Sequence, residues 1–153
     1  MKKRIILAVI FVLVLVSITG CTKDEILGQY NDIIQTAGDV KLTDDFRLKG
    51  VRKYGIDHYT GNYKANYNKF TGTEYLFGGT SINRENGNKV TITCDINSKK
   101  GSAKLILLSG SDGPKILCKP NDNYSKTMTL PAGGNYIGIQ CNNFSGTVKL
   151  NIE

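Results

Sequence analysis

Apolar and polar residues alternate strictly along much of this chain. From residue 59 to 68 each odd position holds Tyr, Gly or Ala, and each even position holds Thr, Asn or Lys. A period of two residues is typical of a β-strand that buries one face. Further short runs of strand type follow, at 73–77, 90–96, 103–108, 115–119, 126–130, 136–141 and 148–152.

Turn-forming residues separate these runs. Asn86-Gly87-Asn88 stands before one run, Pro114 and Pro120 flank another, and Pro131 with two glycines divides the last part of the chain. Short strands that are separated by such turn residues, at roughly ten-residue spacing, indicate antiparallel rather than parallel sheets. The sequence therefore predicts an all-β fold: an antiparallel β-sandwich, jelly-roll or immunoglobulin-like, of about eight strands.

Residues 22–37 have a helical period instead. Their apolar side chains recur at the spacing of one helix face: Ile26, Leu27, Tyr30, Ile33, Ile34 and Ala37. Thr22 to Glu25 has the form of a capping box, and Gly38 stands where a helix would end. We therefore predict a short N-terminal helix in a connecting segment at 21–57, between a leader at 1–20 and the sandwich domain at 58–153.

The leader has three parts. Lys2, Lys3 and Arg4 are followed by an unbroken apolar run at 5–16, and then by Ser17-Ile-Thr-Gly-Cys21. The run is shorter than the roughly 20 apolar residues that a spanning helix needs, and fits a signal peptide. The order Ile18-Thr19-Gly20-Cys21 resembles the lipobox of bacterial lipoproteins. The resemblance implies cleavage before Cys21, diacylglycerol joined to its thiol with fatty-acyl chains such as palmitate in the lipid anchor, and anchoring at the extracytoplasmic face of the cell membrane.

The rest of the chain carries a fainter resemblance. Its segments are 70–74 with 76–79, 130–138, and 144–150. They are similar to small uncharacterised β-sandwich lipoproteins of Firmicutes. This resemblance implies no activity and no catalytic residue.

The charge of the chain is modest once the leader is set aside. The full sequence has 20 Lys and Arg against 13 Asp and Glu, and loss of Lys2, Lys3 and Arg4 would lower the net charge from +7 to +4. This small excess is weak support for nucleic-acid binding, so we expect no nucleic-acid partner. Arg47, Lys49, Arg52 and Lys53 form a local basic cluster, which is most simply a solvated face near the anchor.

Three cysteines remain besides Cys21. Cys94, Cys118 and Cys141 are widely spaced, no Cys-x-x-Cys pair occurs, and the single histidine is His58. A zinc site is therefore poorly supported, and we expect no metal and no cofactor. A disulfide outside the cytoplasm would leave one thiol over. The favoured interpretation is that all three are small buried apolar residues.

Tyrosines supply the candidate binding residues. Tyr59, Tyr63, Tyr67 and Tyr75 fall in a short stretch, and tyrosine rings suit contacts with a glycan or an envelope protein. The first three share one strand face, however, and a sandwich would bury that face. Burial in the core is the favoured alternative for them.

Candidates for catalysis are few. His58 follows Asp57, but neighbouring residues in a strand point to opposite faces. Paired carboxylates can hydrolyse glycosides, and Glu74 is the one acid inside an aromatic-flanked run. The sequence thus favours a membrane-anchored, non-catalytic binding or structural module of the cell envelope. A small carbohydrate-active hydrolase and an accessory subunit of an envelope complex remain as alternatives.

Overall fold

A computed structural model describes residues 42–110 and 113–153 of the chain. These residues form an all-β structure in which a 3-10 turn at Asp45–Arg47 precedes the strands. The strands are β1 (Gly50–Tyr54), β2 (Gly61–Ser81), β3 (Lys89–Ser109), β4 (Lys115–Cys118), β5 (Tyr124–Thr129) and β6 (Gly133–Ile152). The predicted leader, the lipidation residue Cys21 and the predicted helix at 22–37 lie outside the described residues.

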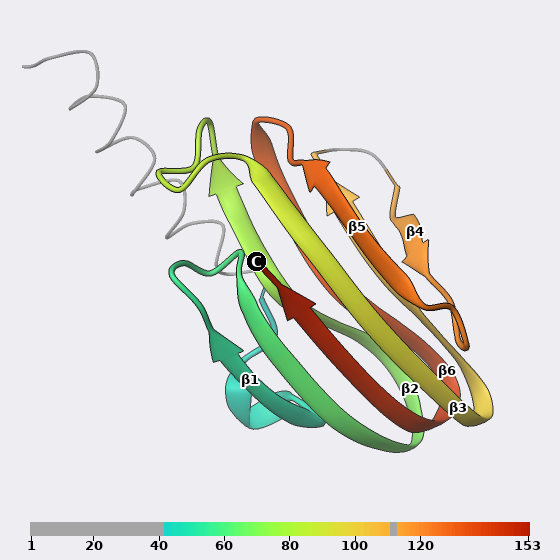
Figure 1. Cartoon of the computed structure of the whole chain (residues 1–153). Helices are drawn as coiled ribbons and strands as arrows, with labels where there is room; N and C mark the ends of the chain where they lie inside the picture. The colour runs from blue at the N-terminus through green and yellow to red at the C-terminus, as the bar shows by residue number, and fades with distance from the viewer. Residues whose placement is uncertain (1–41, 111–112) are drawn as a thin grey trace, which may run out of the picture. The chain divides into compact units, whose positions relative to one another are not determined.

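All strand pairs in this part of the chain are antiparallel, which confirms the predicted all-β antiparallel class. The sheet has six strands in the order β1-β2-β6-β3-β4, and β5 also pairs with β3. Strand β6 therefore lies in the middle, paired with β2 on one side and with β3 on the other (Figure 1). The chain closes the sheet by inserting its last strand between two earlier ones.

Three of the strands are far longer than the sequence suggested. β2 and β3 have 21 residues each and β6 has 20. Each bends sharply near its middle and returns, so that its two halves face each other (Figure 1). The pairing register shifts at the bends, where Phe70 pairs with Phe144 and Lys100 with Ser145. An extra unpaired residue bends a strand without ending it.

These bends explain why the expected number of strands was about eight. The runs at 59–68 and 73–77 are two halves of β2, those at 90–96 and 103–108 belong to β3, and those at 136–141 and 148–152 belong to β6. The residues between the halves have the composition of turns. In the structure they are bulges inside continuous strands.

Strand β1 was not predicted, because it lies in the segment assigned to the connection. It pairs with the first half of β2, with Arg52 opposite Tyr63. The Arg52 guanidinium donates hydrogen bonds to the carbonyl oxygens of Thr43 and Leu76 and to the Asp45 carboxylate, at 2.7–3.0 Å. Arg52 therefore fixes the segment before β1 to the sheet, and it is not part of a solvated basic cluster as the sequence suggested.

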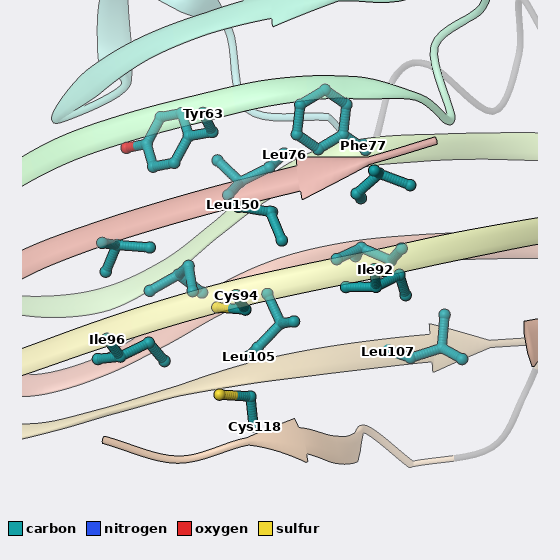
Figure 2. Packing of buried hydrophobic residues seen from close by; sticks show 14 of the residues in the cluster. Tyr63, Leu76, Phe77, Ile92, Cys94, Ile96, Leu105, Leu107, Cys118 and Leu150 are labelled. Atoms are coloured by element: carbon teal, nitrogen blue, oxygen red, sulfur yellow. The ribbon is translucent and has the colours of Figure 1, made fainter. Parts of the chain in front are cut away.

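A single core lies between the facing halves of the long strands. It contains Ile92, Cys94 and Leu150 from the first half of β3 and the second half of β6, and Leu76 and Leu105 from the other halves (Figure 2). Burying apolar surface on both halves is what holds the bent strands together.

The cysteines belong to this core. Cys94, Cys118 and Cys141 are buried free thiols, which confirms the favoured interpretation. In Figure 2 the Cys94 and Cys118 side chains lie among aliphatic ones such as Leu105. Burial raises the pKa of the Cys94 and Cys118 thiols, and raises the pKa of Cys141 to about 12. All three are therefore protonated near neutral pH and poorly reactive.

Candidate functional site

The tyrosines proposed as binding residues are mostly core residues. Tyr59, Tyr63 and Tyr67 are buried, with exposed fractions of 3%, 0% and 2%. Tyr63 and Tyr67 face inward because β2 alternates sides, and the opposite side carries the polar residues. Tyr59 is buried in the turn just before β2. The assignment of these three tyrosines to a ligand-binding surface is therefore corrected. Tyr75 is half-buried and its ring packs edge-on against Tyr136.

Glu74 is also a core residue, with an exposed fraction of 2%. Its Oε2 accepts hydrogen bonds from the hydroxyls of Tyr63, at 3.0 Å, and Tyr67. Its Oε1 accepts a hydrogen bond from the backbone N–H of Lys49 at 2.7 Å. A buried carboxylate needs such donors. Glu74 thus joins the two halves of β2 to the chain just before β1.

The two phenols in this cluster hold their protons firmly. Burial is the main reason why the pKa of Tyr63 and that of Tyr67 lie well above 10, and the adjacent Glu74 raises both further. Each hydroxyl therefore stays a donor toward Glu74. Both Glu74 oxygens thus accept hydrogen bonds inside the core, and they are not exposed at the surface.

Asp57, which precedes His58, is bonded to Arg84 and to the backbone of its own loop. The Asp57 carboxylate accepts hydrogen bonds from Arg84, at 2.7 and 3.2 Å, and from the backbone N–H of Tyr59 at 3.0 Å. Arg84 also stacks on the Tyr59 ring, with its Cζ 4.7 Å from the ring centroid. The exposed His58 ring lies 4.6 Å from that of Tyr54. This polar cluster fixes the loop after β2 to the loop after β1.

A groove of about 640 Å³ lies on the described surface. It crosses three adjacent strands near their bends, where Thr73 of β2 pairs with Gln140 of β6 and Gln140 pairs with Lys104 of β3. A second row contains Thr71, Asn142 and Ser102. These side chains alternate with core residues, so they project from the face opposite the core.

One side of the groove is formed by β4 and the residues after it. Ile116, Lys119 and Pro120 line it there. Cys141 and Ala103 also line the groove although their side chains are in the core, so the groove reaches down to the sheet itself. Among its described lining residues the charged ones are Lys104 and Lys119, and most others are neutral and polar.

Sequence reasoning did not find this groove. Thr73, Lys104 and Gln140 are ordinary polar positions of alternating strands, and 31 or more residues separate any two of them in the chain. They meet because of the registers between β2, β6 and β3. The only local signal was polar alternation, which is the same on any solvated sheet face.

The described residues contain no group of three or more His, Cys, Asp or Glu side chains that could hold a metal ion. In the loop after β4, Asp122 accepts a hydrogen bond from the backbone N–H of Lys119 at 3.2 Å. In the same part of the chain, no helix has the length and apolar character to cross a membrane.

Comparison with known proteins gives no family. No family model matches the sequence, and no curated protein matches it. Among solved structures, a periplasmic inhibitor of g-type lysozyme, PliG from Aeromonas hydrophila, aligns with a TM-score of 0.38 and 12% identity over 66% of this chain and 92% of the inhibitor. The apo form of "BiXyn10A CBM1" aligns with a TM-score of 0.34 and 11% identity over 71% of this chain and 92% of its own. At these scores neither similarity supports an argument about this chain.

Proposed function

We propose that this chain is an extracytoplasmic lipoprotein, anchored to the cell membrane through acylated Cys21, whose β-sheet domain is a non-catalytic binding module. Its ligand would be a glycan or another component of the envelope. The groove across β2, β6 and β3 is the single observation that carries the binding role. Its volume of about 640 Å³ falls within the range of ligand sites, roughly 300–1,000 Å³.

The anchor is supported by the order of the leader segments. Lys2 to Arg4, the apolar run at 5–16 and the small residues before Cys21 follow the sequence of parts expected in a lipoprotein signal. Two or three acyl chains on one cysteine would hold the chain stably, because each buried CH₂ contributes about 0.8 kcal/mol. The described sheet starts at Gly50, so a segment of the chain separates it from the anchor.

A binding role rather than catalysis is supported by the position of Glu74. The acid that the sequence singled out for hydrolysis accepts hydrogen bonds from the hydroxyls of Tyr63 and Tyr67 and from the Lys49 N–H inside the core. A glycosidase needs its carboxylates in a cleft beside the substrate. The groove instead displays hydroxyls, amides and lysines.

We also infer that the folded sheet belongs to the β-sandwich class. The first halves of β2 and β3 pair with the second half of β6, and the second halves of β2 and β3 pair with its first half. The two halves enclose one core. This arrangement is a sandwich whose layers share continuous strands, with the ligand groove on the outer side of one layer.

The anchor is tested by intact mass and detergent partitioning of the protein from its native cells, beside a Cys21→Ser variant. We expect the wild type to lack residues 1–20, to carry acyl mass and to enter the detergent phase. The variant should do none of these. An unmodified Cys21 on a chain released from the membrane would refute the anchor.

The binding role is tested by photo-crosslinking in the same cells. A photoreactive amino acid at Lys104 should crosslink a discrete ligand, while the same probe at Lys126, an exposed residue of β5 outside the groove lining, should not. Equal labelling at both positions, or none at Lys104, would contradict a ligand site in the groove.

A role as accessory subunit is a second candidate, favoured by a specific surface. Phe46, Val51, Tyr54 and Ile56 have exposed fractions of 86%, 64%, 38% and 76% and lie on or beside β1. Phe46 and Tyr54 line one hollow beside β1, whereas Val51 points to the other face of that strand. Exposed apolar residues that lie together often mark protein-binding surfaces. The photoreactive probe at Ile56 separates the two functions, since a specific protein adduct there favours the subunit role.

A further inference from the structure

We propose that the groove across β2, β6 and β3 recognises an acidic glycan, a hydroxyl-rich chain that carries carboxylate or phosphate groups. This inference rests on the proposed binding role and names the class of ligand. It is drawn from the charges, the hydrogen-bonding groups and the rigidity of the groove.

The charged side chains that line the groove have one sign. Lys104 extends from the central row beside Gln140, and Lys119 stands at the end of β4. Asp122 is close in the chain, but it accepts a hydrogen bond from the Lys119 backbone and is not among the lining residues. Two ammonium groups on a concave surface favour an anionic ligand, because the concave shape concentrates their field.

The neutral polar side chains suit hydroxyl groups. Thr71, Thr73 and Ser102 provide hydroxyls, and Gln140 and Asn142 provide amides, so each can both donate and accept hydrogen bonds. The Thr71 Oγ1 accepts a hydrogen bond from the backbone N–H of Asn143 at 2.8 Å, which leaves its own proton to donate outward. A sugar hydroxyl has the same double capacity and can pair with either kind of group.

The composition of the groove disfavours a protein partner. Protein-binding hot spots are enriched in Trp, Tyr and Arg. The described lining contains Thr, Ser, Asn, Gln and Lys, with Ile116 and Pro120 at one side. Aromatic rings that stack on neutral sugars are not among these residues either. Affinity for a glycan must therefore come from charge and hydrogen bonds, and the two lysines favour an acidic glycan over a neutral one.

The polar groups are also held in place before binding. Thr73, Gln140 and Lys104 lie side by side in continuous antiparallel ladders, and the groove spans three strands of one sheet. A ligand that binds such a surface does not have to order a loop, so little free energy is lost.

The test is a binding titration of the mature, anchored protein in detergent micelles with polygalacturonate, which bears carboxylates, phosphomannan, which bears phosphates, and dextran, which is neutral. We expect binding to one or both acidic polymers and at least tenfold weaker binding to dextran. The pair Lys104→Ala/Lys119→Ala should lose at least tenfold in affinity. The pair Lys89→Ala/Lys126→Ala removes the same charge from exposed residues outside the groove lining and should change affinity less than twofold.

Each contrary outcome has a separate meaning. Equal loss in both lysine pairs would show non-specific attraction to the protein and would overturn the inference. If dextran binds and the Gln140→Ala variant binds it more weakly, the ligand is not an acidic glycan, but the proposed binding role of the groove stands. If no polymer binds, the inference fails, and the proposed role then depends on the crosslink at Lys104. Preference between the carboxylate and phosphate polymers identifies the anionic group.

Discussion

Replacing Glu74 by leucine is expected to destabilise the fold by roughly 3–5 kcal/mol, because each buried donor left without an acceptor costs about 1–3 kcal/mol. Leucine has a similar size but accepts no hydrogen bond. The hydroxyls of Tyr63 and Tyr67 would remain in the core, and the Lys49 N–H would lose its acceptor. Urea unfolding followed by far-UV circular dichroism measures the change in the free energy of unfolding.

Tyr67→Phe is the matched control for this prediction. It removes one donor and leaves Glu74 bonded to Tyr63 and to the Lys49 N–H, so we expect a loss of only about 1–2 kcal/mol. The free energy of unfolding of Glu74→Leu could instead lie within about 1 kcal/mol of the wild-type value, which is the contribution of one ordinary hydrogen bond. In that case the carboxylate does not organise this part of the core.

A third variant, Glu74→Gln, separates a structural role of Glu74 from a catalytic one. If Glu74 were a catalytic acid, Glu74→Gln would abolish a hydrolytic activity while the isosteric amide kept much of the stability. The structure predicts instead that Glu74→Gln changes stability rather than a hydrolytic activity, since Glu74 lies in the core with its oxygens occupied. We therefore expect the Glu74 substitutions to act on stability in proportion to the hydrogen bonds they remove.

The sequence was informative where a residue's environment depends on its nearest neighbours in the chain. Alternation at 59–68 predicted both a strand and the burial of Tyr63 and Tyr67, because side chains of a strand point to alternate faces. The wide spacing of Cys94, Cys118 and Cys141, with no metal-binding motif, favoured their burial as small apolar residues, which the structure confirms. The all-β antiparallel class followed from these local patterns.

Two features could not be predicted, because they depend on pairing between distant residues. The runs at 136–141 and 148–152 suggested separate strands, yet the residues between them lie within β6 beside the bend of β3. The groove likewise depends on a register that brings Gln140 between Thr73 and Lys104. A shift by one residue would turn these side chains toward the core.

Gly101 is the residue at which the bend of β3 is most sharply constrained. Its φ angle is +72°, and a Cβ atom there would lie 2.1 Å from the backbone oxygen of Asn143. Gly101→Ala should therefore cost more than the left-handed backbone alone, which amounts to about 1–2 kcal/mol for a residue with a Cβ. We expect a loss of about 3 kcal/mol or more, because the backbone of β6 must move away.

Gly87→Ala distinguishes backbone conformation from close approach. Gly87 has a similar φ of +80°, but a Cβ atom there would meet nothing within 4 Å. This variant should lose about 1–2 kcal/mol, the conformational cost alone. An equal loss in both variants, measured by urea unfolding, would mean that the strands can separate at the bend without penalty. A larger loss for Gly101→Ala would instead show that tight packing of β3 against β6 holds the bend, and with it the adjacent groove residues Ser102 and Asn142.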